Sequence, residues 1–343
     1  MGPFITITIT VLVFGFLIFI HEFGHYITAR IFKVTINEFS IGMGPTLLWY
    51  DSKKTGIRYK LAMLPIGGYV AMAGEDDESD DPNSFDKKPA WQRFIITFAG
   101  AFVNIVFGFI VMIIVTSMMN IGTTKIHSFA EESTSSAALM AGDEIIEVEG
   151  KRVRIADELA YEIMRHGNEP VDILVLRNGE EVFLPDVNFP IEEESGQIFG
   201  RVDFAVVGIK NKSFGDVMTY SFSKSWLMLR MCWESIFDLI TGRYTFAAVS
   251  GPVGISGAIG DAAASGLIPL LNIVVIISIN LGFMNLLPIP ALDGGRLLTV
   301  LIEMVTRKRI PKKIEGLING IGLMLLLLLS LVIMVKDVIG LII

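Results

Sequence analysis

The sequence predicts a polytopic α-helical membrane protein with four transmembrane helices, a re-entrant β-hairpin and an inserted small α+β domain. Hydrophobic residues make up 52% of the 343 residues, and charged residues only 19%. Four stretches contain no charged side chain: residues 1–20, 94–122, 262–292 and 316–335. A bilayer core about 30 Å thick requires roughly 20 apolar residues in helical form. Each stretch is therefore long enough to cross the membrane.

The basic residues give these spans an orientation. They cluster after the first span, from Arg30 to Arg93, and again between the third and fourth spans, from Arg307 to Lys313. Loops rich in Lys and Arg remain in the cytoplasm. We therefore expect both termini and residues 122–261 on the outer side. The first span lacks a basic n-region and a small-residue cleavage site, so we do not expect a signal peptide.

Residues 57–70 form the predicted β-hairpin. Two short extended pieces surround a Pro/Gly turn, whose apolar tip contains Gly67 and Gly68. Two interpretations fit this pattern equally. The tip enters the membrane, where its backbone must line a protein cavity, or the segment is a small cytoplasmic hairpin.

The inserted domain occupies residues 122–210. A helix is predicted from Ala156 to Arg165 and ends before Gly167. Alternating apolar residues on both sides of Asn178-Gly179 predict a tight β-hairpin. Residues 201–209 supply a last strand.

The region that follows, residues 211–266, is predicted to hold a surface helix and a loop. Arg230, Glu234 and Asp238 recur on one face of an apolar helix over residues 213–240, which predicts an amphipathic helix on the membrane surface rather than a fifth span. Residues 241–266 are rich in Gly, Ala and Ser and are predicted to be a loop. The membrane part thus comprises residues 1–121 and 267–343.

The first span ends in His21-Glu22-Phe23-Gly24-His25. Residues four apart share a helix face, so both imidazoles can bind one metal ion. The carboxylate of Glu22 can reach a water on that metal as a general base. Imidazole ligands suit Zn²⁺, and one ion per chain is expected. The alternative is solvation at a membrane interface, but ionisable groups closing an apolar span are usually functional.

A catalytic zinc site requires a third protein ligand. The remaining histidines, His127 and His166, belong to the inserted domain. Asp293 follows the third span, which ends on the same side of the membrane as the first. Asp293 is therefore the expected third ligand, although an aspartate at this place can also cap a helix.

Several residues near these motifs, together with Gly67 and Gly68 of the predicted hairpin, are candidates for substrate binding or support. Pro288 and Pro290 interrupt the helix, and Asn280 and Asn285 place amides in the membrane region. These amides either hold an extended substrate and its oxyanion or bind neighbouring helices. In the second span, Asn104 is a candidate for supporting the metal site, and Gly100 allows close packing.

These motifs together resemble the site-2 protease family of intramembrane zinc metalloproteases, in particular the bacterial regulator-of-sigma-E protease group. The matching elements are the HExxH motif at His21–His25, the element from Asn280 through Pro288-Ile289-Pro290 to Asp293-Gly294, and the GxxxN element at Gly100–Asn104. Residues 57–70 are similar to the family's re-entrant β-loop. Residues 122–210, with Ala141–Gly150, resemble a single PDZ domain, where some members have two.

The resemblance implies an endopeptidase that cuts transmembrane segments of single-span membrane proteins, such as anti-sigma factors or signal-peptide remnants. It implies a bacterial cytoplasmic membrane location, an extracytoplasmic PDZ domain and an upstream site-1-type protease that acts first on the same substrate. The net charge of −8 argues against nucleic acid as a partner. The single cysteine, Cys232, excludes a cysteine metal cluster.

Two other classes of protein have different requirements. A metal transporter or sensor could use His21, His25 and Asp293 but has no need of Glu22 or an outer peptide-binding domain. An inactive scaffold acting through the PDZ domain has no need of an intact Glu22 and ligand set.

Overall fold

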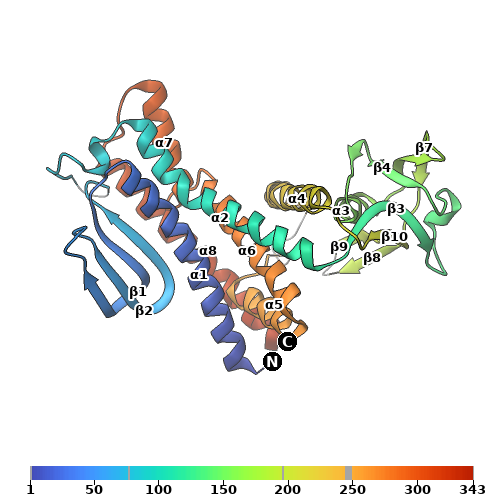
Figure 1. The fold of residues 1–343 in the computed structure, drawn as a ribbon, viewed down its shortest axis with the longest axis horizontal. Helices are drawn as coiled ribbons and strands as arrows, with labels where there is room; N and C mark the ends of the chain where they lie inside the picture. The colour runs from blue at the N-terminus through green and yellow to red at the C-terminus, as the bar shows by residue number, and fades with distance from the viewer. Residues whose placement is uncertain (1, 76–77, 195–196, 244–248, 343) are drawn as a thin grey trace. The chain divides into compact units, whose positions relative to one another are not determined.

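The computed structural model describes residues 2–75, 78–194, 197–243 and 249–342. The chain forms two compact units (Figure 1). The first contains Met1–Val111 and Val249–Ile343, and the second contains Met112–Ala248. The sequence places the end of the inserted domain at residue 210, whereas the second unit also includes the long helix that follows.

Four described helices are long and apolar enough to cross a membrane, in agreement with the four predicted spans. They are α1 (Pro3–Ile31), α2 (Ala90–Met118), α6 (Leu267–Leu286) and α8 (Lys312–Ile342). Proline favours the first turn of α1, where no backbone donor is needed. The helix α6 ends at Leu286 because Pro288 cannot continue it. The protein is therefore an integral membrane protein by the length and composition of these helices.

Two long bent strands, β1 (Ile36–Asp51) and β2 (Arg58–Met72), lie beside α1 (Figure 1). Residues 36–41 of β1 pair with both ends of β2, since Phe39 lies opposite Tyr59 and also opposite Val70. The extended pieces predicted over residues 57–70 are confirmed, but the simple hairpin is not, because a segment of β1 runs between them. This arrangement leaves residues 68–72 as an outer segment of the sheet.

The first unit, called the membrane unit from here on, also contains the 3-10 helix η1 (Phe85–Lys87), α5 (Pro252–Ser265) and α7 (Asp293–Thr306). The prediction of a loop over residues 241–266 is wrong where α5 forms; residues 244–248 lie outside the described residues. Asp337 of α8 explains this helix, because its carboxylate accepts hydrogen bonds from the backbone N–H groups of Gly251 and Gly254. A carboxylate at a helix N-terminus stabilises it.

The second unit is built on a sheet with strand order β10-β3-β4-β6-β7, with β5 paired to β4. Its strands are β3 (Ile121–Phe129), β4 (Glu144–Val148), β5 (Lys151–Arg152), β6 (Val171–Arg177), β7 (Glu180–Val187) and β10 (Phe204–Ile209). A separate ladder joins β8 (Ile191–Glu194) and β9 (Gln197–Gly200), and η2 (Ser135–Ala137) precedes β4. Asn178 and Gly179 both have positive φ, which confirms the predicted tight turn between β6 and β7.

The helix α3 (Ala156–His166) covers this sheet and confirms the predicted helix that ends before Gly167. Its apolar face supplies Leu159 and Ile163 to the core of the domain. Both side chains are almost completely buried, which stabilises the domain by roughly 1.5–3 kcal/mol each.

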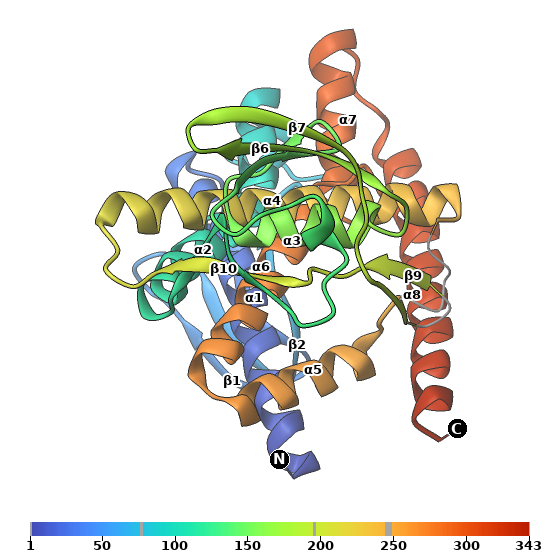
Figure 2. The same ribbon diagram turned by 90° about the vertical axis from the view of Figure 1, so that its right-hand side faces the viewer.

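The helix α4 (Phe214–Thr241) lies along α3 (Figure 2). Its predicted polar face contacts α3 instead of water. Arg165 donates two hydrogen bonds to Asp238, at 2.6 and 2.8 Å, and Tyr161 donates one to Glu234 at 2.7 Å. The side chain of Arg230 also contacts Glu162, which is fully buried. The sequence did not reveal these partners, because they belong to a helix some 70 residues away.

Ionised groups hold α3 and α4 together. Burial alone would raise the pKa of Glu234, but the Tyr161 hydroxyl and three cations, Lys151, Arg165 and Arg230, lower it below its usual value. Glu234 is therefore charged at neutral pH. Buried charges that are paired and hydrogen-bonded in this way fix the relative position of two elements.

Candidate metal centre

The helix α1 carries His21, Glu22 and His25, and all three residues line one cavity of the membrane unit. His21 and His25 lie one turn apart on the same face of α1, and both side chains are buried. Their Nε2 atoms are only 3.3 Å apart. Two imidazole nitrogens held this close in a buried place can serve one shared cation.

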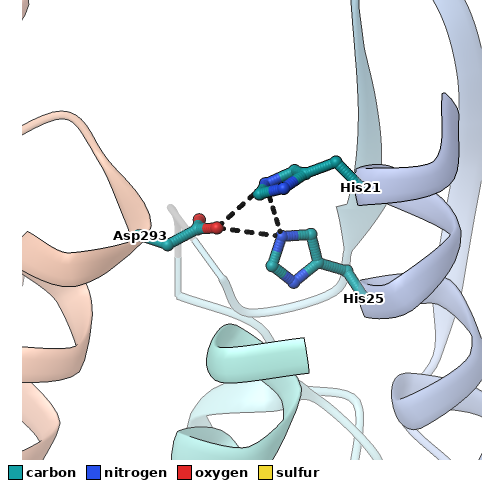
Figure 3. A group of neighbouring side chains, drawn as sticks. All are labelled: His21, His25 and Asp293. Atoms are coloured by element: carbon teal, nitrogen blue, oxygen red, sulfur yellow. Dashed lines mark hydrogen bonds and ion pairs between the residues drawn. The ribbon is translucent and has the colours of Figure 1, made fainter. Parts of the chain in front are cut away.

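Asp293 approaches the two histidines from α7 (Figure 3). Its Oδ2 atom lies 3.0 Å from Nε2 of His21 and 3.2 Å from Nε2 of His25. Asp293 is the first residue of α7, and the backbone around it turns sharply after α6. The structure thus brings together the three side chains that the sequence singled out, from segments more than 260 residues apart.

Two glycines make this sharp turn possible. A Cβ atom at Gly294 would lie 1.9 Å from the carbonyl oxygen of Leu287, and one at Gly295 would lie 2.6 Å from that of Ile289. Any other residue at these positions would force the start of α7 away from the end of α6. The glycines after Asp293 therefore fix where its carboxylate lies.

The helix α2 approaches both imidazoles closely at Gly100. A Cβ atom there would lie 2.3 Å from Nε2 of His25 and 2.9 Å from Nε2 of His21. On the other side of its ring, Nδ1 of His25 lies 2.8 Å from the carbonyl oxygen of Ile96. A carbonyl only accepts hydrogen bonds, so Nδ1 carries the proton and Nε2 keeps its lone pair for a metal.

The side chain of Asn104 lies beside Nδ1 of His21, as the carbonyl of Ile96 lies beside Nδ1 of His25. The side-chain nitrogen of Asn104 lies 3.4 Å from Nδ1 of His21, while its buried Oδ1 has no hydrogen-bond partner among the described residues. The oxygen and nitrogen of an amide are interchangeable assignments. Exchanging them gives Oδ1 a donor, the Nδ1–H of His21, and again leaves Nε2 free for a metal.

The three side chains fit a zinc ion. Their ligand atoms all lie within 4.8 Å of one another. Oδ2 of Asp293 is buried and, within the described part of the chain, forms no hydrogen bond of acceptable geometry despite its closeness to both rings. A cation between the three atoms would satisfy this oxygen. Two imidazoles and one carboxylate, with a fourth position open, are the ligand set of a catalytic zinc site.

The three ligand candidates line a cavity of about 630 Å³ together with Glu22. Part of the lining is residues 69–74, from the end of β2 and the turn after it, and the lining also includes Glu75 and Arg296, which form an ion pair. The backbone N–H of Val70 donates a hydrogen bond to the Glu22 carboxylate. The cavity therefore contains a carboxylate able to act as acid or base, the candidate metal site and the outer segment of a β-sheet.

Gly68 allows β2 to approach Glu22. A Cβ atom there would lie 2.9 Å from the carbonyl oxygen of Ser40 and 3.1 Å from Cγ of Glu22. Gly67, with a φ of +88°, provides the bend that precedes it. These two glycines therefore influence the site by setting the path of β2 past Glu22.

The other candidate residues lie around the site in different ways. Among the described residues, the cavity lining does not include Asn280, Asn285, Pro288 or Pro290. The two prolines shape the turn before α7. Conversely, sequence reasoning missed Arg296, which lines the cavity three residues after Asp293. The helical spacing from Asp293 was the one signal that could have pointed to it.

Comparisons with known proteins agree with a membrane metalloprotease. The model of peptidase family M50 matches residues 9–329. A protein of Fusobacterium nucleatum, named as a zinc metalloprotease, is 36% identical over 97% of this chain and 98% of its own length. Another of Clostridium acetobutylicum is 34% identical over 98% of both chains. The zinc metalloprotease RasP of Geobacillus kaustophilus is 29% identical over 96% of both chains.

Fold, site and relatives thus define a zinc metalloprotease that acts within the membrane. The chain belongs to peptidase family M50, the site-2 protease family. Its cofactor is zinc, as in the related zinc metalloproteases.

Proposed function

We propose that the protein hydrolyses peptide bonds in transmembrane segments of single-span membrane proteins. In this proposal His21, His25 and Asp293 hold one zinc ion per chain, and Glu22 is the general base. The observation that carries this proposal is the approach of Oδ2 of Asp293 to both Nε2 atoms, in the same cavity as Glu22. Neither a transporter nor a scaffold requires a carboxylate at the place of Glu22.

When bound, zinc polarises a carbonyl group and lowers the pKa of a water molecule. Glu22 then accepts the proton of the attacking water and returns it to the leaving amine, which breaks the peptide bond. The hydrogen bond from Val70 N–H aims the Glu22 carboxylate into the cavity. The carbonyl of Ile96 and the amide of Asn104 keep both imidazoles in the tautomer that leaves Nε2 free.

A substrate would enter as an extended strand on β2. A peptide bond in a transmembrane helix is shielded by the helical hydrogen bonds, so the segment must first unwind. Residues 68–72 pair with residues 36–41 on one side of the strand. Residues 69–72 also line the cavity. An edge of this kind binds an added strand through main-chain hydrogen bonds. Residues 57–72 would then form a re-entrant loop, whose backbone lines the cavity as membrane depth demands.

The second unit fits the role of a PDZ-like domain on the extracytoplasmic face of a bacterial cytoplasmic membrane. The positive-inside rule supports this side of the membrane for the second unit, because the basic residues flank the opposite ends of the spans. The family resemblance supports anti-sigma factors or signal-peptide remnants as substrates, trimmed first by a site-1-type protease. The aromatic side chains of α4 support contact with lipid, since Trp226 and Trp233 are more than half exposed.

The variant Glu22→Gln tests the proposed base. In purified protein with a single-span substrate, it should retain about one zinc per chain and lower kcat by at least about 100-fold. Removal of zinc by a chelator should abolish cleavage by the wild type, and added zinc should restore it. Wild-type rates in Glu22→Gln would contradict the role of Glu22.

A further inference from the structure

We infer that the last transmembrane helix, α8, positions the carboxylate of Asp293 through Asn319 and Gly322, which hold the Pro288–Asp293 turn in place. This inference rests on the proposed role of Asp293 as a ligand. Neither residue belongs to a motif that the sequence analysis singled out, and neither touches the cavity that contains Glu22.

The helix α8 has one inward face in an otherwise exposed apolar span. Most of its leucines and isoleucines are exposed, as expected for a lipid-facing helix. Its inward residues recur at helical spacing and each meets a different part of the membrane unit. Glu315 contacts Thr299 of α7, Asn319 and Gly322 contact the turn before α7, and Asp337 contacts the start of α5.

Asn319 holds a backbone conformation that alanine disfavours. Ala291 has a φ of +73°, in the left-handed region where a Cβ atom is sterically unfavourable. Its N–H donates a hydrogen bond to Oδ1 of Asn319 at 3.3 Å. Only Leu292 separates Ala291 from Asp293. The direction in which the chain leaves Ala291 therefore determines where α7 begins and where the Asp293 side chain points.

Gly322 lets α8 come close enough for this contact. A Cβ atom at Gly322 would lie 2.5 Å from Cβ of Pro290 and 2.8 Å from its carbonyl oxygen. Proline cannot move aside by changing a flexible side chain, and its carbonyl belongs to the turn itself. A larger residue would push the helix and the turn apart. Asn319 and Gly322 lie three residues apart, on the same face of α8.

If these contacts position Asp293, their loss should displace its carboxylate while the rest of the fold remains intact. Asn319→Leu removes the acceptor for Ala291, and Gly322→Ala separates α8 from Pro290. Both variants should weaken zinc binding by about 10- to 100-fold, the usual effect of losing a residue that orients a metal ligand. The zinc dissociation constant of purified full-length protein, measured by chelator competition, gives this value directly.

The chain supplies matched controls on the same helix. Among the described residues, a Cβ atom at Gly316 or Gly320 would meet nothing within 4 Å. Gly320→Ala should therefore leave the zinc dissociation constant within about twofold of wild type. Ala291→Gly supplies a rescue, because glycine adopts a positive φ without strain. Added to Asn319→Leu, it should restore most of the lost affinity.

Hydrogen exchange in the zinc-free protein separates this inference from the proposed zinc site. Amides in residues 289–297 should exchange at least about tenfold faster in Asn319→Leu and Gly322→Ala than in wild type or Gly320→Ala. This result would stand even if the wild type bound no zinc, a finding that would refute the proposed function alone. Unchanged exchange of residues 289–297 in both variants, or equal effects of Gly320→Ala and Gly322→Ala, would overturn the role of α8.

Discussion

At the scale of single residues, the site depends on small side chains as much as on the metal-binding ones. Gly100 leaves room for both imidazoles, Gly68 lets β2 reach Glu22, and Gly294 closes the turn beside Asp293. Each is the only residue type that fits, because a Cβ atom would overlap a neighbouring atom. The ligand geometry therefore depends on the absence of a side chain at these three glycines as well as on hydrogen bonds.

Replacing Gly100 by alanine should damage the metal site. The new Cβ atom would overlap the His25 ring, so the ring would have to leave the position in which its Nε2 atom lies beside Asp293. We expect zinc affinity to fall by about 10- to 100-fold, with a matching loss of cleavage at limiting zinc. Gly257→Ala in α5 is the control, since no described atom lies within 4 Å of its Cβ position. Equal zinc affinity in both variants would refute this prediction.

Replacing Asn104 by leucine tests the assigned tautomer of His21. Leucine has a similar size but cannot accept the Nδ1–H of His21, so either imidazole nitrogen could then carry the proton. Zinc affinity should drop by about 10- to 100-fold. Asn104→Asp keeps an acceptor oxygen and should retain more affinity than the leucine variant. The prediction fails if leucine is tolerated as well as aspartate.

The metal motif was accessible to sequence reasoning because its spacing reflects helix geometry. His21 and His25 repeat at four residues. The other histidines belong to the inserted domain, and Asp293 is the carboxylate that follows the third span. The supporting roles of Gly100 and of Asn319 could not be predicted in the same detail. They depend on which helix faces meet, and this information is absent from the local sequence.

At the scale of elements, α4 shows how a pattern can be correct and its partner unknown. The periodicity of Arg230, Glu234 and Asp238 correctly predicts a helix with one charged face. The partner of that face is α3 instead of water. Charged residues on a helix face favour water or an oppositely charged partner equally well, so sequence alone could not distinguish them. The helix α5 was missed for a similar reason, since Asp337 stabilises its glycine-rich start from α8.

Breaking the Arg165–Asp238 pair should loosen α4 from α3. Both side chains are less than 10% exposed, so Arg165→Leu leaves Asp238 buried without its partner. Loss of one member of a buried pair costs about 3–5 kcal/mol. Hydrogen exchange of the α4 amides in the full chain should show a fall in opening free energy of that order.

The double variant Arg165→Leu with Asp238→Leu provides the control. It removes both charges and should recover much of the loss, because an apolar pair has no desolvation penalty. If the double variant is as unstable as the single one, packing rather than the ion pair joins the helices.

At the scale of the whole molecule, the chain combines long apolar helices that can cross a membrane with one inserted unit that contains a β-sheet. This division was predictable, because apolar stretches of about 20 residues have few alternatives to a transmembrane helix. The sequence did not predict how far along the chain the second unit extends. It includes α4, whose start is tied to the end of α2 by Lys212, which donates to the carbonyl oxygens of Thr116 and Ser117.

This tether predicts that α4 lies at the lipid surface. Phe222, Trp226, Trp233 and Phe237 are more than half exposed on one side of α4. In lipid nanodiscs, brominated lipids should quench Trp226 and Trp233 in a variant whose other tryptophans, Trp49 and Trp91, are phenylalanine. Exposed tryptophan side chains favour the membrane–water interface. Absence of quenching at both positions would show that protein, not lipid, covers this face.

The central claim is that two imidazoles and one distant carboxylate share a single zinc ion. X-ray absorption at the zinc edge of purified wild-type protein, combined with zinc analysis of Asp293→Ala, tests it most directly. We predict about one zinc per wild-type chain, with two imidazole nitrogens at about 2.0–2.1 Å and oxygen ligands, and loss of tight binding in Asp293→Ala. One tightly held zinc per chain in Asp293→Ala, with an unchanged absorption spectrum, would contradict the account.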